Sequence, residues 1–348
     1  MQNRTLLTLR ILAFSKLVIL INLVFPMGGQ AIAPNEATIA VSGEETIFLT
    51  NPEGKGGGAV NALFNLATDN EDPRPLGLEW SPDGRKLAFH ATSQKNTDIY
   101  IVDANGKNLR RITDHEGVDS WPDWHPGGRK LAIASNRDGN LEIYVMSDGG
   151  NIIANLTNDP APDKMPSWSP DGRRIAFSSK RGRTLGDIYV MNSDGGNQVN
   201  YTNHKGEDIQ PEFSFEGDRI AWITRRDGTG NVWVMDAEVG EDGAQNVFEI
   251  FSQEEKQDIT WNPNDKQVAT IMFAGGSAWI VIYDVKNAAG KGNHENRFNL
   301  PVIGEAGSIN RGPAWFDPDF VVEFAVSPAG KQPLSWGWVK QLGSSSAR

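Results

Sequence analysis

The segment Trp168-Ser-Pro-Asp-Gly172 is one copy of a block that recurs about every 44 residues along this chain of 348 residues. Each copy begins with an aromatic residue, and a turn that resembles Ser-Pro-Asp-Gly follows it. The leading aromatic residues are Trp80, Trp124, Trp168, Phe213, Trp261 and, with a looser turn, Trp315. Their successive spacings are 44, 44, 45, 48 and 54 residues. A repeat of this period predicts similar units that bury their apolar faces against one another.

Each unit can be divided into four short strands. In the unit led by Trp124, alternating apolar segments follow at residues 130–135, 141–146 and 152–157. The turns between them contain Gly-Gly and Asp-Gly pairs, which tolerate the positive φ of tight hairpins. We therefore expect four antiparallel strands per unit, the first of which ends at the leading aromatic residue.

A second aromatic residue recurs in the third strand of the units. These residues are Tyr100, Tyr144, Tyr189 and Trp233, each 20 or 21 residues after its leading aromatic residue. Because the position repeats with the unit, we expect both aromatic positions to pack between neighbouring sheets. A functional aromatic cage is the alternative.

Counting the units predicts an all-β fold, a six-bladed β-propeller of four-stranded antiparallel blades over residues 34–318. Five units are complete, and residues 37–68 resemble the last three strands of a sixth. The segment 313–315 supplies the missing first strand, so N- and C-terminal strands share one blade. Such closure removes exposed sheet edges. Residues 319–348 form a C-terminal tail or an extra strand.

The first 33 residues differ from the rest of the chain. Arg4, Arg10 and Lys16 precede an apolar run from Leu17 to Phe25, and small residues at 31–33 offer a cleavage site. This pattern predicts a signal peptide over residues 1–33. An uncleaved anchor is the alternative, but the run is shorter than the roughly 20 residues that cross a bilayer. We expect a periplasmic or secreted protein, cleaved near Ala33, with no membrane span in the mature chain.

The composition narrows the classes of partner. The chain has no cysteine, so disulfides cannot stabilise it after export. Without the predicted signal peptide it carries 30 basic and 44 acidic residues, a formal net charge of −14. Such a surface repels nucleic acid and favours cationic or metal-bearing partners, although a purely solubilising role is the alternative. We expect a monomer that does not bind nucleic acid.

Two motifs carry a resemblance to a known family. Pro-x-Trp-Ser-Pro-Asp-Gly-Arg is followed by Asp-Ile-Tyr-Val-Met and then by a Gly-Gly-Asn turn. Over residues 36–316 the chain resembles the TolB-type six-bladed β-propellers, WD-repeat-like proteins that bacteria export. TolB proteins bind a peptidoglycan-associated lipoprotein at the channel mouth, so the resemblance implies a propeller that binds a protein or peptide. They also carry an α/β domain before the propeller, which we expect to be absent because few residues follow Ala33 before the first strand.

The sequence lacks the motifs of the common hydrolases. It has no Gly-x-Ser-x-Gly segment and no cysteine nucleophile, and its five histidines form no zinc motif. A divalent cation such as calcium stays an alternative, but no set of metal ligands can be chosen from the sequence. We therefore expect no cofactor.

One set of candidate binding residues remains. Each member lies six residues after the Thr or Ser that ends a predicted fourth strand. The set is Asp119, Asp163, Asp208 and Asp258. Because these loops lead into innermost strands, we expect the four carboxylates to gather at one mouth of the central channel and attract a basic peptide group or a metal ion. The alternative is that each accepts hydrogen bonds from its own turn.

These observations favour a non-enzymatic module that binds a cationic protein or peptide ligand at the channel mouth. The alternative function is a metal-dependent hydrolase or lactonase that uses channel carboxylates and one divalent ion. A detached propeller of a prolyl-oligopeptidase-like enzyme is a third interpretation, but the sequence offers no catalytic domain.

Overall fold

A computed structural model describes residues 38–43, 46–50, 61–65, 74–92, 96–182, 185–226, 228, 230–238, 240–246, 256–274, 277–285, 294–299 and 309–316. The chain separates into two compact units, residues 1–30 and 31–348, and every described residue belongs to the second. The predicted signal peptide (1–33) and tail (319–348) lie outside the described residues. Within those residues, no helix has the length and apolar character needed to cross a membrane.

All regular elements in the described ranges are β-strands, which pair as six four-stranded antiparallel sheets. One sheet joins the two ends of the propeller region in the order β24-β1-β2-β3. Its strands are β1 (Thr38–Gly43), β2 (Thr46–Thr50), β3 (Asn61–Asn65) and β24 (Ile309–Phe316). In this sheet Ile39 lies opposite Trp315 and Ala40 opposite Ala314.

The other five sheets each use four consecutive strands. The strand order follows the chain in each of them. Two of these sheets contain β4 (Arg74–Trp80), β5 (Lys86–Thr92), β6 (Thr97–Asp103) and β7 (Arg110–Arg111), then β8 (Asp119–Trp124), β9 (Lys130–Ser135), β10 (Glu142–Ser147) and β11 (Ile152–Asn155). Two more contain β12 (Asp163–Trp168), β13 (Arg174–Ser179), β14 (Asp187–Asn192) and β15 (Val199–Asn200), then β16 (Asp208–Phe213), β17 (Arg219–Thr224), β18 (Asn231–Asp236) and β19 (Gly240–Asn246). The last contains β20 (Lys256–Trp261), β21 (Gln267–Ala274), β22 (Ser277–Asp284) and β23 (His294–Asn299).

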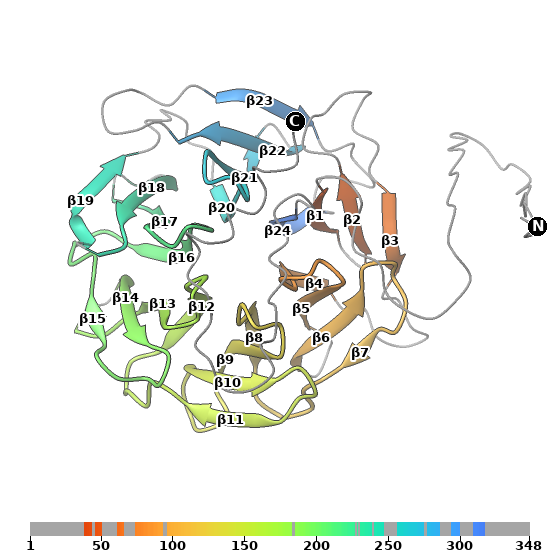
Figure 1. Ribbon diagram of the computed structural model, residues 1–348, viewed down its shortest axis with the longest axis horizontal. Coiled ribbons are helices and arrows are strands. Elements are labelled where there is room, and N and C mark those ends of the chain that lie inside the picture. Colours follow the sequence, from red (N-terminus) through yellow and green to blue (C-terminus); the bar gives the residue numbers. More distant parts are fainter. Residues whose placement is uncertain are drawn as a thin grey trace, which may run out of the picture. The chain divides into compact units, whose positions relative to one another are not determined.

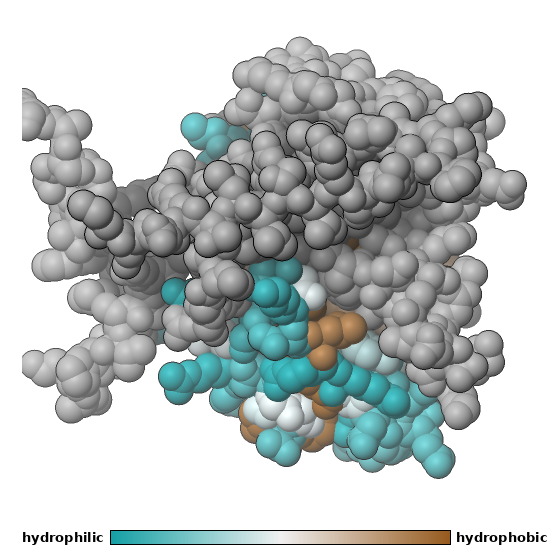
Figure 2. Space-filling view, turned by 90° about the vertical axis from the view of Figure 1, so that its right-hand side faces the viewer, coloured by the Kyte–Doolittle hydropathy of each residue, from teal (hydrophilic) through white to brown (hydrophobic). Residues whose placement is uncertain are grey.

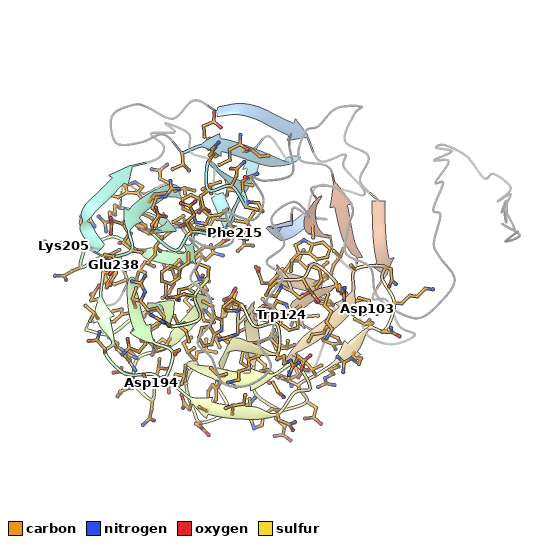
Figure 3. All side chains as sticks on the ribbon, viewed as in Figure 1. Asp103, Trp124, Asp194, Lys205, Phe215 and Glu238 are labelled. Atoms are coloured by element: carbon orange, nitrogen blue, oxygen red, sulfur yellow. The ribbon has the colours of Figure 1, made fainter. Side chains whose placement is uncertain are left out.

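The sheets are arranged as the blades of a propeller (Figure 1). The first strand of each repeat unit lies nearest the centre, and the fourth lies at the perimeter. Trp124 projects near the centre, whereas Asp103, Asp194 and Lys205 lie at the perimeter (Figure 3). The all-β propeller predicted from the repeat is confirmed.

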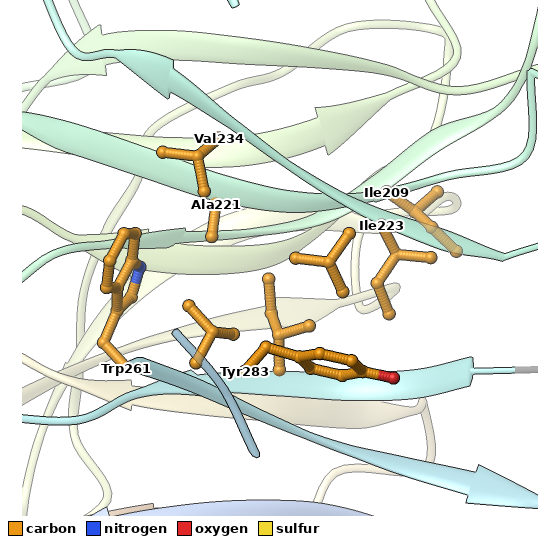
Figure 4. Close-up of a cluster of buried hydrophobic side chains, with 9 residues drawn as sticks. Ile209, Ala221, Ile223, Val234, Trp261 and Tyr283 are labelled. Atoms are coloured by element: carbon orange, nitrogen blue, oxygen red, sulfur yellow. The ribbon is translucent and has the colours of Figure 1, made fainter. Parts of the chain in front are cut away.

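The hydrophobic core is divided among the interfaces between neighbouring blades. One cluster joins Ile209, Ala221 and Val234 of one blade to Trp261 and Tyr283 of the next (Figure 4). Four similar clusters lie between other pairs of neighbouring blades in the described ranges. Each contains one leading aromatic residue, namely Trp80, Trp124, Trp168 or Phe213. The third-strand aromatic residues lie in or against these clusters too. The prediction that both aromatic positions pack between sheets is confirmed.

The described outer surface is mainly polar. On the face shown in Figure 2, hydrophilic residues predominate over the coloured area and the hydrophobic areas are small. The exposed large apolar residues of the described ranges are Leu109, Ile152, Ile153, Leu185 and Val199. They lie on or beside outer strands, or in turns, and scattered apolar residues of this kind are normal on a soluble surface. The central channel is therefore the first place to look for a site.

Candidate functional site

A backbone irregularity recurs in the innermost strands. The third residue before each leading aromatic residue has positive φ, and the pairing with the second strand shifts there. These residues are Gly77 (57°), Trp121 (49°), Met165 (56°), Gln210 (55°) and Asp258 (51°). Such bulges re-aim side chains and are frequent beside active sites. A left-handed conformation costs a residue other than glycine on the order of 1 kcal/mol or more, so the blades must hold it in place.

The bulged strands surround a cavity of about 90 Å³ in the channel. Its wall comes from the innermost strands of five successive blades, β4, β8, β12, β16 and β20. Each strand contributes residues that lie just before its leading aromatic residue. The lining residues are Gly77, Leu78, Glu79, Trp121, Pro122, Asp123, Met165, Pro166, Ser167, Gln210, Pro211, Glu212, Asp258 and Ile259. Apolar surface and a few acidic groups therefore converge on one space.

The residue immediately before each leading aromatic residue also links neighbouring blades. In three consecutive units its side chain accepts a hydrogen bond from the backbone N–H of the next leading aromatic residue. The bonds run from Trp168 N to Asp123 Oδ2 (2.6 Å), from Phe213 N to Ser167 Oγ (3.1 Å) and from Trp261 N to Glu212 Oε1 (3.1 Å). These side chains hold the blades in register around the cavity.

The cavity carboxyls have raised pKa values. Burial raises the pKa of Asp123 to about 7, although the N–H of Trp168 opposes the shift. Burial, followed by the charge of Asp123, raises the pKa of Glu212 to about 8 despite the hydrogen bond from Trp261. Burial and the charges of Asp123 and Glu212 raise the pKa of Glu79 well above its ordinary value. The three carboxyls therefore share a space in which full ionisation is unfavourable.

We expect the free energy of unfolding to fall between about pH 4, where these carboxyls ionise in the unfolded chain, and about pH 8, where Glu212 ionises in the folded protein. A carboxyl with a raised pKa binds a proton in the folded protein that the unfolded chain has already released. Its contribution is complete below the ordinary values of 3.8 and 4.5 and is lost as the pH rises through about 7 for Asp123 and about 8 for Glu212. Urea unfolding across this range should show the fall in the wild type and a smaller one in Glu212→Gln. The exposed Glu116→Gln should leave it unchanged, and a flat wild-type profile would contradict the burial of these charges.

Three of the four predicted candidates lie in ion pairs inside the blades. Their side chains are fully buried and each contacts an arginine 18 positions further along the chain. The pairs are Asp119 with Arg137 (3.0 Å), Asp163 with Arg181 (2.5 Å) and Asp208 with Arg226 (2.6 Å). Each arginine also stacks on the third-strand aromatic residue of its blade, Tyr144, Tyr189 or Trp233, at 5.2, 5.4 and 4.9 Å from the ring centroid. Arginine charge thus compensates these carboxylates, whose part in binding stays a prediction.

Asp258 lies at a different position from the other three. Its strand begins at Lys256, which is the residue equivalent to Asp119 in the sheet register. Asp258 instead occupies the bulge and lines the cavity, where its carboxylate accepts a hydrogen bond from the Gln210 side chain. The expectation of four equivalent positions is therefore wrong for Asp258, because it lies three residues before its leading aromatic residue, whereas the other three lie five residues before theirs.

Sequence reasoning missed Glu79, Asp123 and Glu212. The signal was present, because each stands directly before a leading aromatic residue. Alternation along a strand places that residue on the sheet face opposite to the aromatic one, toward the next blade, where Asp123 meets Trp168 and Glu212 meets Trp261.

A separate acidic group could hold a metal ion on distance alone. Among the described residues, Glu216, Asp218 and Asp265 are the group whose ligand atoms all lie within 4.8 Å of one another. Asp265 already accepts the backbone N–H groups of Phe215 (2.7 Å) and Glu216 (2.6 Å). The group lies on turns away from the cavity lining, so it gives no support to a metal-dependent enzyme in the channel.

Residues 75–316 match the PD40 family, described as the TolB beta propeller domain. The chain belongs to this family. A curated TolB relative, the Tol-Pal system protein TolB of Thioalkalivibrio sulfidiphilus (strain HL-EbGR7), is 34% identical over 74 residues, which make up 19% of this chain and 17% of the relative. The match therefore spans well under two thirds of the relative's length.

Two solved structures show the same fold. TolB from Acinetobacter baumannii has a TM-score of 0.64 at 23% identity, over 80% of this chain and 66% of that one. A chain of a nidogen/laminin complex has a TM-score of 0.63 at 12% identity, over 80% of this chain and 98% of that one. At these identities the likeness concerns the fold alone and not a shared site.

Proposed function

We propose that this TolB-family propeller is a non-enzymatic module that binds a protein or peptide segment in its central channel. The observation that carries the proposal is the cavity of about 90 Å³ walled by five successive innermost strands. Its lining combines Trp121, Met165 and prolines with a few converging polar groups, which is the usual composition of a ligand site. Tryptophan and methionine are also enriched where proteins bind one another.

Backbone strain at the cavity supports a functional role. Trp121, Met165, Gln210 and Asp258 adopt positive φ at the positions that line the cavity. Strained residues persist where the surrounding fold fixes them and cluster at ligand sites. They recur in four consecutive blades, so the same bulge is repeated around the cavity wall.

We propose export to the periplasm or beyond the cell as the setting of this module. The signal-peptide pattern from Arg4 to Ala33 supports this location, as does the Tol-Pal name of the curated relative. We also propose that the sheet of β24, β1, β2 and β3 completes a closed ring of six blades. The pairing of β24 with β1 supports this closure, which would fix the channel walls.

Selection of peptides from a random display library against the full chain tests the function. Peptides that bind in the channel should lose at least about thirtyfold in affinity for Trp121→Asn, because truncating a central tryptophan commonly costs 2 kcal/mol or more. Asn tolerates the left-handed backbone, so this change tests the ring with little effect on the bulge. Ile153→Ala, an exposed truncation on β11, is the control. Selected peptides that bind both variants equally would place recognition outside the channel and refute the proposal.

A further inference from the structure

Three carboxylates line the cavity without a compensating cation. Each of the charges that shift the pKa values of Glu79, Asp123 and Glu212 is negative. A cation does lie beside one lining residue, since the Lys164 ammonium group is 6.0 Å from the ring centroid of Trp121. It is not among the charges that act on these three carboxyls.

The protein's own hydrogen bonds satisfy the three carboxylates only in part. The N–H of Trp168 donates to one oxygen of Asp123, and Glu212 accepts hydrogen bonds from the N–H of Trp261 and from the Thr260 side chain. Glu79 pairs with Ala88 through its backbone, and among the described residues its carboxyl group makes no side-chain hydrogen bond. All three residues are half-buried, and carboxylates crowded together in this state favour protons or a bound cation that neutralises them.

The geometry favours an organic cation over a metal ion. The ligand atoms of these three residues are not among those that come within 4.8 Å of one another in the described part of the chain. The cavity of about 90 Å³ is several times the roughly 10–15 Å³ that one water needs. Trp121 and Met165 offer the aromatic face and the thioether that alkylammonium and guanidinium groups contact favourably.

We infer that Glu79, Asp123 and Glu212, which line one cavity with Trp121 and Met165, together receive one ammonium or guanidinium group of a bound peptide. On binding, the cation takes the place of a proton that the raised pKa values of Asp123 and Glu212 favour in the free protein. This inference rests on the proposed peptide-binding function and names the chemical group that the channel selects. The exchange is balanced, since the cation enters and one H⁺ leaves to the solvent. No covalent bond forms or breaks apart from the O–H bond of the carboxyl.

The exchange makes binding dependent on pH. Protonated carboxyls must release a proton before they can hold the cation, so affinity should rise as the pH passes about 7 and about 8, where Asp123 and Glu212 ionise. Asp258, which raises the pKa of Glu212, should shift this dependence toward higher pH, and Lys164 beside Trp121 should lower the affinity slightly by repulsion.

Calorimetry with small probes tests the inference on the full chain. The probes are N-acetyl-arginine methylamide, N-acetyl-lysine methylamide, the neutral N-acetyl-norleucine methylamide and calcium chloride. The arginine or the lysine probe should bind at least about tenfold more tightly than the norleucine probe at about pH 8. Titration in buffers of different ionisation enthalpy should show a proton released on binding. Asp123→Asn and Glu212→Gln keep their hydrogen-bond acceptors and should reduce this affinity about tenfold or more, whereas Glu116→Gln, an exposed change on the loop before β8, should not.

Each other outcome has a definite meaning. The inference is overturned if the norleucine probe binds the wild type as tightly as the cationic probes do, or if binding to the wild type releases no proton. Both measurements use the wild-type protein, so they hold even if a variant fails to fold. Tight binding of calcium with no binding of the organic probes replaces it with a metal site. If display peptides depend on Trp121 but show no preference for Lys or Arg, the proposed function stands and this inference fails. If the cationic probes bind but no peptide depends on Trp121, the carboxylate site stands and the peptide-binding function fails.

Discussion

Asp208→Asn should lower the free energy of unfolding by about 3–5 kcal/mol, because it leaves a buried guanidinium without its charge partner. The Asp208 side chain is fully buried and that of Arg226 is 6% exposed. Two nitrogens of Arg226 contact the carboxylate, at 2.6 Å and 3.2 Å, and its guanidinium lies over the ring of Trp233. The carboxylate therefore fixes the turn between β17 and β18 against the start of β16. Urea unfolding measures the change.

The control for this effect is Asp114→Asn, an exposed change on an equivalent loop, which should stay within about 0.5 kcal/mol of wild type. The double variant Asp208→Asn/Arg226→Met should lose less free energy of unfolding than the sum of the losses of the two single variants, because it leaves neither charge buried alone. If Asp208→Asn kept wild-type stability and slowed the association of a cationic peptide, Asp208 would be a binding residue of the channel mouth. That result would restore the function first expected from the sequence.

The leading aromatic residues made the fold predictable. A large aromatic side chain that recurs every 44 residues must be buried somewhere, and no single four-stranded sheet can bury it alone. Trp124 and Trp261 accordingly lie in clusters that join two blades. The same spacing predicted the joining of β24 to the N-terminal strands, because the two partial units complement each other.

The site was less predictable because it depends on local backbone conformation. Nothing in the identity of Trp121 or Met165 indicates positive φ, since neither residue favours it. The bulge comes from the fit of each inner strand against its neighbour, which appears only once the sheets are formed. The Asp–Arg pairs did leave a signal, an 18-residue spacing in three consecutive units. Counting back from the leading aromatic residue would also have separated Asp258 from the other three.

Deleting residues 309–348 should lower the melting temperature by about 10 °C or more and broaden the transition. The deletion removes β24, whose backbone pairs with β1 from Thr38 opposite Phe316 to Gly43 opposite Ile309. Each lost hydrogen bond contributes about 1 kcal/mol, and for a chain of this size each kcal/mol corresponds to roughly 2–4 °C. The loss also exposes the edge of β1, which can then pair with another chain. Calorimetry and light scattering measure the two effects.

Deleting residues 319–348 alone is the matched control, because it leaves β24 in place and removes most of the same length of chain. If closure by β24 holds the ring, this shorter deletion should keep the melting temperature within about 2 °C of the full chain, since the pairing of β24 with β1 stays intact. An equal fall in both deletions would assign the stabilisation to the tail. A cooperative, unshifted transition after removal of residues 309–348 would show that five blades fold without the closing strand. The cavity wall would then need no sixth blade, because its lining comes from β4, β8, β12, β16 and β20 alone.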